Sequence, residues 1–260
     1  MRTEDYEIMH ALESDYWWFV GMREITGALM GRHVALKPRR ILDIGCGTGI
    51  NLLWMSRLQR PDQVVGCDFS PTALGLCRRT LSSSAAGARF SLARGDIRRL
   101  PFAAKSFDLV TTSEVLDILA PGEDDAALAD LHRVLRPGGM AFVRVPAYQW
   151  LLSSHDTLFE TRHRYSAGEI RSKMEAAGFR VHAVTYANTL LFPLAMTQRL
   201  LRKWFGIAGG KTDTQPWPRW LAWLDTLFRT CLAAEAAMLR RGWTLPFGLS
   251  AICIGGRLPE

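Results

Sequence analysis

Residues 41–49 read ILDIGCGTG, an apolar run that passes directly into a turn rich in glycine. Glycines let the backbone turn sharply after a strand and come close to a ligand. A helix that begins at such a turn offers its free N–H groups to that ligand. The stretch therefore predicts a strand, a ligand-binding turn and a helix.

Short apolar runs alternate with helical segments through the rest of the chain, which predicts a parallel sheet covered by helices on both faces. Ser70-Pro71 marks a helix start and Gly178 a helix end, because serine caps helices, proline begins them and glycine ends them. The RPGG run at 136–139 predicts a helix stop and a turn. The expected strands are 39–44, 63–68, 88–93, 107–113, 140–145, 179–186 and 249–255, and the expected helices are 49–60, 71–81, 124–136 and 166–177.

The composition is 48% hydrophobic and 22% charged over 260 residues, which fits one ordinary globular domain and excludes disordered and collagen-like chains. Five scattered cysteines form no CxxC pair and no Cys/His cluster. We therefore expect no disulfide framework and no metal site, and a reducing cytoplasm. Because the N-terminus is acidic and no stretch approaches about 18 uninterrupted apolar residues, we expect neither secretion nor a membrane span.

The net charge of +7 is concentrated near the C-terminus, where residues 186–260 hold nine Lys/Arg against four Asp/Glu and five of the nine tryptophans. No compact Lys/Arg run accompanies them, so we expect no nucleic-acid partner. Basic amphipathic helices with tryptophan also suit an anionic membrane surface. Peripheral membrane contact therefore stays open as a second role for this region.

The second expected strand ends at Asp68, about 20 positions after the glycine turn. A carboxylate there can accept hydrogen bonds from both ribose hydroxyls of a nucleotide. A nicotinamide dehydrogenase would carry a further glycine where this chain has Ile50. Asp43 beside the turn suits an ammonium group and would repel a pyrophosphate, which favours S-adenosylmethionine (SAM), although Asp43 could instead be a capping residue of the turn.

With ILDIGCGTG, the runs VVGCDFS, RGDIRRLPF, FDLVTTSEVLDIL, LHRVLRPGG and MAFVRVPA resemble a class I SAM-dependent methyltransferase over residues 39–186. The resemblance implies a Rossmann-like, seven-stranded, doubly wound α/β sheet with an antiparallel last strand and a helical cap. It also implies that the glycine loop cradles the methionine moiety, that Asp68 binds ribose and that Phe69 lies against adenine. The implied cofactor residues of the core are Asp43, Gly45, Cys46, Gly47, Gly49, Asp68, Phe69, Asp96, Ile97, Ser113 and Glu114.

The flanking segments are similar to a bacterial subgroup that acts on small, frequently hydrophobic metabolites. They are YWWF at 16–19, VPAYQWLLSSHD at 145–156 and LPFGLS at 245–250. The usual VLEH after the fourth strand is here VLDI at 115–118, so its histidine is missing. The motifs leave open the acceptor, the methylated atom and the oligomeric state.

Two segments lie outside the alternation and define the expected organisation. The N-terminal helix with Tyr16, Trp18 and Arg23 is expected to close over the cofactor, with Arg23 on the SAM carboxylate; ordinary packing on the sheet is the alternative. Helices over 187–205 and 217–241 are expected to line an apolar acceptor pocket or to pack on the sheet. The second helix carries one apolar stripe, formed by Trp220, Leu224, Leu227, Cys231 and Met238. The expected parts are a lid (1–36), a SAM-binding core (37–186), an acceptor cap (187–246) and the last core strand (247–260).

Methyl transfer from a sulfonium requires the protein to position a small-molecule acceptor, exclude water and, for oxygen or nitrogen acceptors, remove a proton. The loop after the fifth strand offers His155 as the base, Asp156 as its orienting partner and His163 as the alternative base. The same cluster could instead hold the loop or bind a divalent ion. Two rival functions also remain: a SAM-fold partner subunit without turnover, and a SAM-using enzyme that does not transfer methyl.

Overall fold

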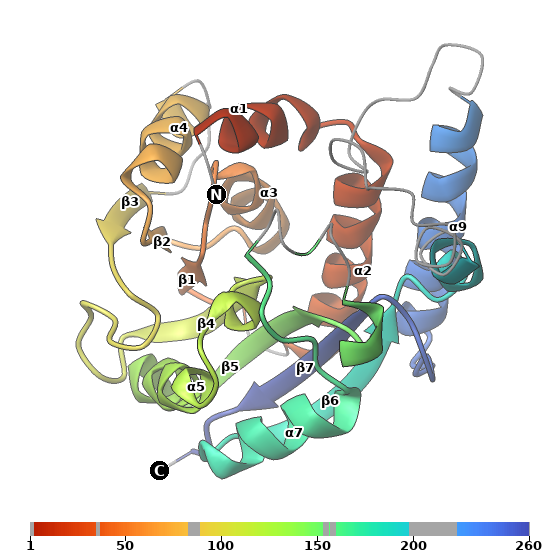
Figure 1. Cartoon of the computed structure of the whole chain (residues 1–260). Coiled ribbons are helices and arrows are strands. Elements are labelled where there is room, and N and C mark those ends of the chain that lie inside the picture. Colours follow the sequence, from red (N-terminus) through yellow and green to blue (C-terminus); the bar gives the residue numbers. More distant parts are fainter. Residues whose placement is uncertain are drawn as a thin grey trace.

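One seven-stranded sheet forms the centre of the protein (Figure 1). The computed structural model describes residues 3–34, 37–82, 89–152, 156, 160–197 and 223–259. The strand order is β3-β2-β1-β4-β5-β7-β6, with parallel pairs from β3 through β5 and β7 antiparallel to both of its neighbours. This confirms the expected Rossmann-like fold. The strands are β1 (Arg40–Ile44), β2 (Gln63–Asp68), β3 (Arg89–Arg94), β4 (Phe107–Ser113), β5 (Leu135–Pro146), β6 (Arg180–Ala187) and β7 (Ser250–Gly256).

Helices cover both faces of the sheet because the side chains of each strand alternate between them. Ile41 packs in a cluster with residues of α2, α3, α4 and α9, and its neighbour Leu42 packs in a cluster with residues of α5 and α7. Each face thus has its own apolar core. The helices are α1 (Thr3–Leu12), α2 (Trp17–His33), α3 (Ile50–Gln59), α4 (Pro71–Ser82), η1 (Leu116–Ile118), α5 (Glu123–Val134), η2 (Gln149–Leu151), α7 (Ala167–Ala176) and α9 (Trp223–Arg240).

The expected helix signals act as predicted in the core. The Ser70 hydroxyl accepts the N–H of Ala73 at 3.3 Å, and Gly178 has φ of +96° just after α7. Strand β5 begins earlier than expected, at Leu135. Leu135 pairs with Phe107 and Met140 with Leu109, so residues 136–139 bulge out of the strand between these two pairs.

Helices α2 and α9 pack against each other beside the sheet (Figure 1). A Cβ on Gly21 would lie 2.2 Å from Leu232 Cδ1, so glycine permits the close approach. The Asp225 carboxylate accepts the N–H of Trp17 at 3.2 Å, and the rings of Trp17 and Phe228 lie 5.0 Å apart, edge to face. The two segments outside the core alternation are therefore joined to each other as well as to the sheet.

The expected cap helices are only partly correct. Residues 187–191 are not helical, and a helix begins at 192 and continues to 197, the last described residue of this segment. Positions 198–205 and 217–222, with Trp220, lie outside the described residues. The expected stripe on α9 is rotated, because Leu227 is exposed. The buried side chains of α9 are Phe228, Leu232, Glu235, Ala236 and Leu239.

Candidate active site

The glycine turn after β1 requires glycine at two positions. Gly45 and Gly49 have φ of +72° and +88°, in the left-handed region that side chains rarely adopt. A Cβ on Gly45 would lie 2.2 Å from Val115 Cγ2, and one on Gly49 would lie 2.5 Å from Cys77 Sγ. Glycine at these two positions therefore lets the loop pack closely against Val115 and against Cys77 of α4. Gly47 (φ +54°) and the buried Cys46 complete the loop.

Asp68, at the end of β2, joins this loop to the next helix. Its carboxylate accepts the N–H of Gly47 at 2.9 Å and that of Ser70 at 2.8 Å. Burial raises the pKa of Asp68, and these backbone hydrogen bonds oppose the rise. The acid and the glycine loop thus form one unit at the carboxyl edge of the sheet, where ligands bind in this type of fold.

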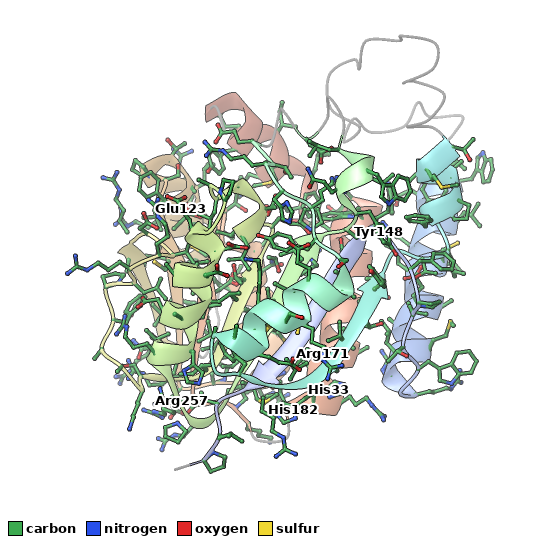
Figure 2. All side chains as sticks on the ribbon, turned by 60° about the horizontal axis from the view of Figure 1, so that its bottom comes forward. His33, Glu123, Tyr148, Arg171, His182 and Arg257 are labelled. Atoms are coloured by element: carbon green, nitrogen blue, oxygen red, sulfur yellow. The ribbon has the colours of Figure 1, made fainter. Side chains whose placement is uncertain are left out.

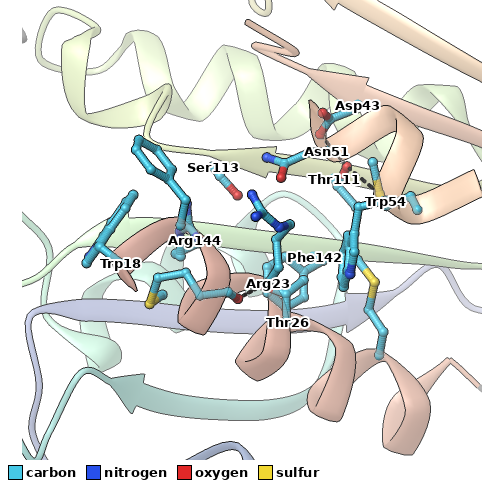
Figure 3. Close-up of a pocket in the computed structure, with 14 residues that line it drawn as sticks. Trp18, Arg23, Thr26, Asp43, Asn51, Trp54, Thr111, Ser113, Phe142 and Arg144 are labelled. Atoms are coloured by element: carbon cyan, nitrogen blue, oxygen red, sulfur yellow. Dashed lines mark hydrogen bonds between the residues drawn. The ribbon is translucent and has the colours of Figure 1, made fainter. Parts of the chain in front are cut away.

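A pocket with about 430 Å³ of empty space, part of it open to solvent, lies between α2, α3 and the carboxyl ends of β1, β4 and β5 (Figure 3). Asp43 is its buried acid. The Thr111 hydroxyl donates to the Asp43 carboxylate at 2.5 Å, and burial raises the pKa of Asp43 to about 7. The lining residues are Trp18, Phe19, Met22, Arg23, Thr26, Met30, Asp43, Asn51, Trp54, Met55, Thr111, Ser113, Phe142 and Arg144.

Two guanidinium groups accompany Asp43 in this pocket (Figure 3). Arg23 donates to the backbone carbonyl of Glu13 at 2.8 Å. Arg144, 8% exposed, donates to the Glu114 carboxylate at 3.2 Å and lies 5.4 Å from the ring of Trp18. Four of the expected cofactor residues, Trp18, Arg23, Asp43 and Ser113, therefore line one pocket, with Glu114 bonded to its rim.

The remaining expected cofactor residues are spread around the loop. Tyr16 is buried, and its ring contacts those of Trp17 and Phe19. Phe69 is 67% exposed, with the Arg94 guanidinium 5.7 Å from its ring centre.

Asp96 and Ile97 lie after β3, on the side where the resemblance places adenine. The Asp96 carboxylate pairs with Arg98, which lowers its pKa. Ile97 is buried. Neither the ion pair of Asp96 nor the burial of Ile97 bears on their expected role in recognising adenine.

The polar cluster after β5 is held by internal pairs. The Arg164 guanidinium donates twice to one oxygen of the Asp156 carboxylate, at 2.9 and 2.5 Å. His163 Nε2 lies 2.6 Å from the Glu169 carboxylate, which also closes the capping box of α7. His155 lies outside the described residues. Asp156 and His163 thus each have a partner that holds the loop.

The sequence reasoning missed three charged residues near these sites. Arg144 was visible as a lone charge in the apolar run MAFVRV. Asp117 is 2% exposed, and its carboxylate accepts the Thr161 hydroxyl at 2.9 Å; among the residues that the structure describes, its second oxygen has no hydrogen-bond partner. Glu13 precedes the YWWF motif with no signal of its own. Within the described ranges, no three metal-ligating side chains gather at one place.

The comparisons with known proteins agree with this geometry. A family described as a methyltransferase domain matches residues 41–139. An uncharacterized methyltransferase of Synechocystis sp. is 31% identical over 172 residues, covering 62% of this chain and 77% of that protein. The chain belongs to the class I SAM-dependent methyltransferases. SAM is therefore its cofactor, and it supplies an electrophilic methyl group on a sulfonium.

Two further comparisons concern a relative in sequence and a solved structure with a similar fold. A demethylmenaquinone methyltransferase of Lactiplantibacillus plantarum is 29% identical over 167 residues, covering 54% of this chain and 70% of that protein. A solved SAM-dependent methyltransferase from Methanosarcina mazei superposes with a TM-score of 0.57 at 17% identity, covering 89% of this chain and 98% of that chain. At that identity the second likeness shows the fold alone.

The residues of this methyltransferase fit its cofactor. The backbone of the glycine loop has positive φ angles at Gly45, Gly47 and Gly49, and Asp68 presents a carboxylate beside it. The pocket next to the loop holds an acid and a guanidinium, Asp43 and Arg23, which match the ammonium and carboxylate of a methionine moiety. No described helix is both long enough and apolar enough to cross a membrane.

Proposed function

We propose that this methyltransferase acts on a small acceptor with an aromatic or other apolar part, bound against a cluster of rings at the carboxyl edge of β5 and β6. We call it the ring cluster. Figure 2 places Tyr148 at the edge of the sheet opposite His33 and His182. The ring cluster comprises Tyr148, Trp150, Tyr186, Phe192 and Phe247.

The exposure of the ring cluster is the observation that carries this proposal. The rings of Tyr148 and Tyr186 stack at 5.2 Å, and those of Phe192 and Phe247 lie 5.5 Å apart. Trp150 remains 56% exposed and Phe247 40% exposed. Exposed apolar patches of this kind are typical of ligand or partner sites. A stacked surface of rings favours a flat or apolar acceptor.

Backbone strain at Tyr148 supports a functional role for the ring cluster. Tyr148 has φ of +62°, which costs a residue with a side chain about 1–3 kcal/mol. Its N–H donates to the carbonyl of Tyr165 at 3.0 Å, and its ring lies on Tyr186. Such strain persists where surrounding contacts hold it, often at binding sites. The relative named for demethylmenaquinone, a quinone, agrees with an apolar ring as acceptor.

The proposal also assigns roles to the loop after β5, to the N-terminal segment and to the cap. His155 is the proposed base, with Asp156 as its orienting partner and His163 as the alternative base. Arg164, which donates to the Asp156 carboxylate, holds the loop. Residues 1–36 act as a lid, with Tyr16, Trp18 and Arg23 next to the cofactor, and residues 187–246 act as the acceptor cap. Docking on an anionic membrane is a second role of the basic cap, which sedimentation with anionic vesicles at low and high salt tests.

A screen of candidate acceptors tests the proposal. Mass spectrometry would follow gain of one methyl group on aromatic, fatty and strictly polar compounds. For an accepted apolar compound, Trp150→Ala should raise KM about tenfold, since one lost stacking contact costs roughly 1–2 kcal/mol. The control is Trp243→Ala, because Trp243 is equally exposed but absent from the ring cluster.

Three outcomes would go against the proposed acceptor. A screen in which only strictly polar compounds are methylated would contradict it, and so would equal effects of the two tryptophan variants. Conversion of an acceptor without gain of a methyl group would favour the rival SAM-using enzyme. Binding of SAM without any conversion would favour the partner subunit.

A further inference from the structure

Helix α1 and the residue that follows it, Glu13, make three contacts around the glycine loop and the end of β2. The side chains of Tyr6 and Ser70 are hydrogen-bonded, next to Asp68. The end of the Met9 side chain lies 3.9 Å from where a Cβ on Gly47 would be. The Thr48 hydroxyl donates to the Glu13 carboxylate. Figure 1 shows α1 in red beside α4, so the N-terminal helix covers the loop that holds SAM.

Glu13 places a buried carboxylate beside this loop. Its side chain is 7% exposed, and that of Thr48 is 1% exposed. Arg23 is close, but its guanidinium donates to the backbone carbonyls of Glu13 and Ser14, at 2.8 and 3.1 Å. Within the part of the chain that the structure describes, no cationic side chain pairs with the Glu13 carboxylate. A buried carboxylate needs such a partner to remain ionised without a large cost.

We propose that Glu13 is a ligand of the ammonium group at the methionine end of SAM. Thr48, which holds the Glu13 carboxylate, belongs to the loop that cradles this end of the cofactor. Arg23 links Glu13 to the pocket of Asp43, because it bonds to the Glu13 backbone and also lines that pocket. An ammonium has three donors. One of them can meet the Glu13 carboxylate, while Arg23 serves the carboxylate of the same methionine moiety.

The electrostatics of Glu13 agree with this role. Burial raises the pKa of Glu13 to about 7, and the Thr48 hydrogen bond and the Arg23 charge oppose the rise. An arriving cation would favour the ionised form of the acid, and the interaction would be a charge-assisted hydrogen bond. The inference is independent of which acceptor the enzyme uses.

Calorimetric titration of two ligands tests the inference on the full chain. SAM carries the methionine moiety, whereas 5′-methylthioadenosine shares the adenosine and the sulfur but lacks the ammonium and the carboxylate. Glu13→Gln, which can keep the Thr48 hydrogen bond, should weaken SAM about tenfold and leave methylthioadenosine unchanged. The matched control is Glu7→Gln, an exposed glutamate on α1, the helix that precedes Glu13, which should change neither affinity.

Other results would overturn the assignment. An equal loss of affinity for both ligands would mean that Glu13 supports only the adenosine part of the site. Unchanged or tighter SAM binding would mean that the Glu13 carboxylate does not bind the ammonium group. Thermal unfolding of each ligand-free variant checks that it folds. Glu13→Asp, which keeps the charge on a shorter side chain, supplies a second measurement: an intermediate loss for SAM and none for methylthioadenosine.

Discussion

We call α1–α3 with the glycine loop and the ends of β1 and β2 the cofactor half, and the loop after β5 with η1, α5, α7 and α9 the acceptor half. The buried acids of this methyltransferase differ between these two halves. In the cofactor half, Glu13 and Asp43 accept hydroxyl hydrogen bonds, from Thr48 and Thr111. In the acceptor half, the Asp156 carboxylate pairs with Arg164 at 2.5 Å, and Asp124 pairs with Lys173 at 2.9 Å. The acids paired with a cation hold parts of the fold together. We propose that the hydroxyl-bonded acids of the cofactor half, Glu13 and Asp43, are available to a cationic ligand.

Two buried acids of the acceptor half, Asp117 and Glu235, have no cationic partner among the described residues. Glu235 accepts the backbone N–H groups of Asn188 and Leu190, at 2.8 and 2.7 Å.

The Asp117 carboxylate accepts a hydroxyl hydrogen bond from Thr161, and burial together with the charge of Glu114 raises the pKa of Asp117. The Asp117 carbonyl also accepts the N–H groups of Arg162 and His163, at 2.7 and 3.0 Å. This residue therefore ties the loop after β5 to the end of β4, at the place where the sequence departs from VLEH.

Breaking a paired acid should have the largest effect. Arg164→Ala leaves the Asp156 carboxylate buried without its cation and removes a 3.0 Å hydrogen bond to the Ala147 carbonyl. We expect a loss of about 3–5 kcal/mol in the free energy of unfolding, measured by urea denaturation.

The neighbouring Arg162→Ala is the control for this variant. Arg162 is exposed, so we expect a change of about 0.5 kcal/mol or less. Equal effects of the two substitutions would show that the Asp156–Arg164 pair does not hold the acceptor loop.

An acid that lacks a cation should make stability depend on pH. The pKa of Asp43 is raised to about 7, mainly by burial, with Thr111 and Arg144 lowering it and Asp68 raising it. The folded protein thus holds a proton that the unfolded chain releases. The stabilisation is full below about pH 4 and is lost as the pH rises through 7. Relative to Asp43→Asn, wild type should lose about 2–4 kcal/mol between about pH 4 and about pH 8.

Urea denaturation of both proteins across this pH range measures the difference. The control is Asp62→Asn, because Asp62 forms an exposed ion pair with Arg39. Its difference from wild type should stay nearly constant. A wild-type curve parallel to that of Asp43→Asn would mean that Asp43 is already ionised in the folded protein.

The smallest effect is expected at His163. Its bond to Glu169 is partly exposed, and such pairs contribute about 0–1 kcal/mol. His163→Gln should therefore change stability by less than about 1 kcal/mol, and turnover of an identified acceptor by no more than about twofold. Glu169→Gln, which removes the other partner, should behave alike. A drop in turnover of about a hundredfold in the first variant alone would make His163 the base.

The cofactor half was predictable because its signals are local. The positive φ angles of Gly45 and Gly49 and the position of Asp68 at a strand end follow from residues adjacent in the sequence. The acceptor half depends on distant contacts. Which face of α9 is buried is set by the approach of Leu232 to Gly21, more than 200 positions away, and this approach leaves Leu227 exposed.

The pairing of acids also escapes a sequence pattern. Asp156 and Arg164 are eight positions apart in a loop, and no periodicity relates them. Arg144 in an apolar strand was the one visible sign that a charge had to be compensated inside the protein. Glu13 reaches the glycine loop only because α1 folds back over it, a contact between residues 35 positions apart.

Calorimetric titration of SAM into wild type and Asp68→Ala tests most directly the claim that the glycine loop and the end of β2 form the cofactor site. Asp68 bridges two backbone N–H groups and is the proposed ribose ligand. Losing this charged acceptor should cost roughly 1.5–3 kcal/mol, more than about tenfold in affinity. The same loss should appear for 5′-methylthioadenosine, which carries the same ribose. Unchanged affinity for SAM in a folded Asp68→Ala protein would contradict the account.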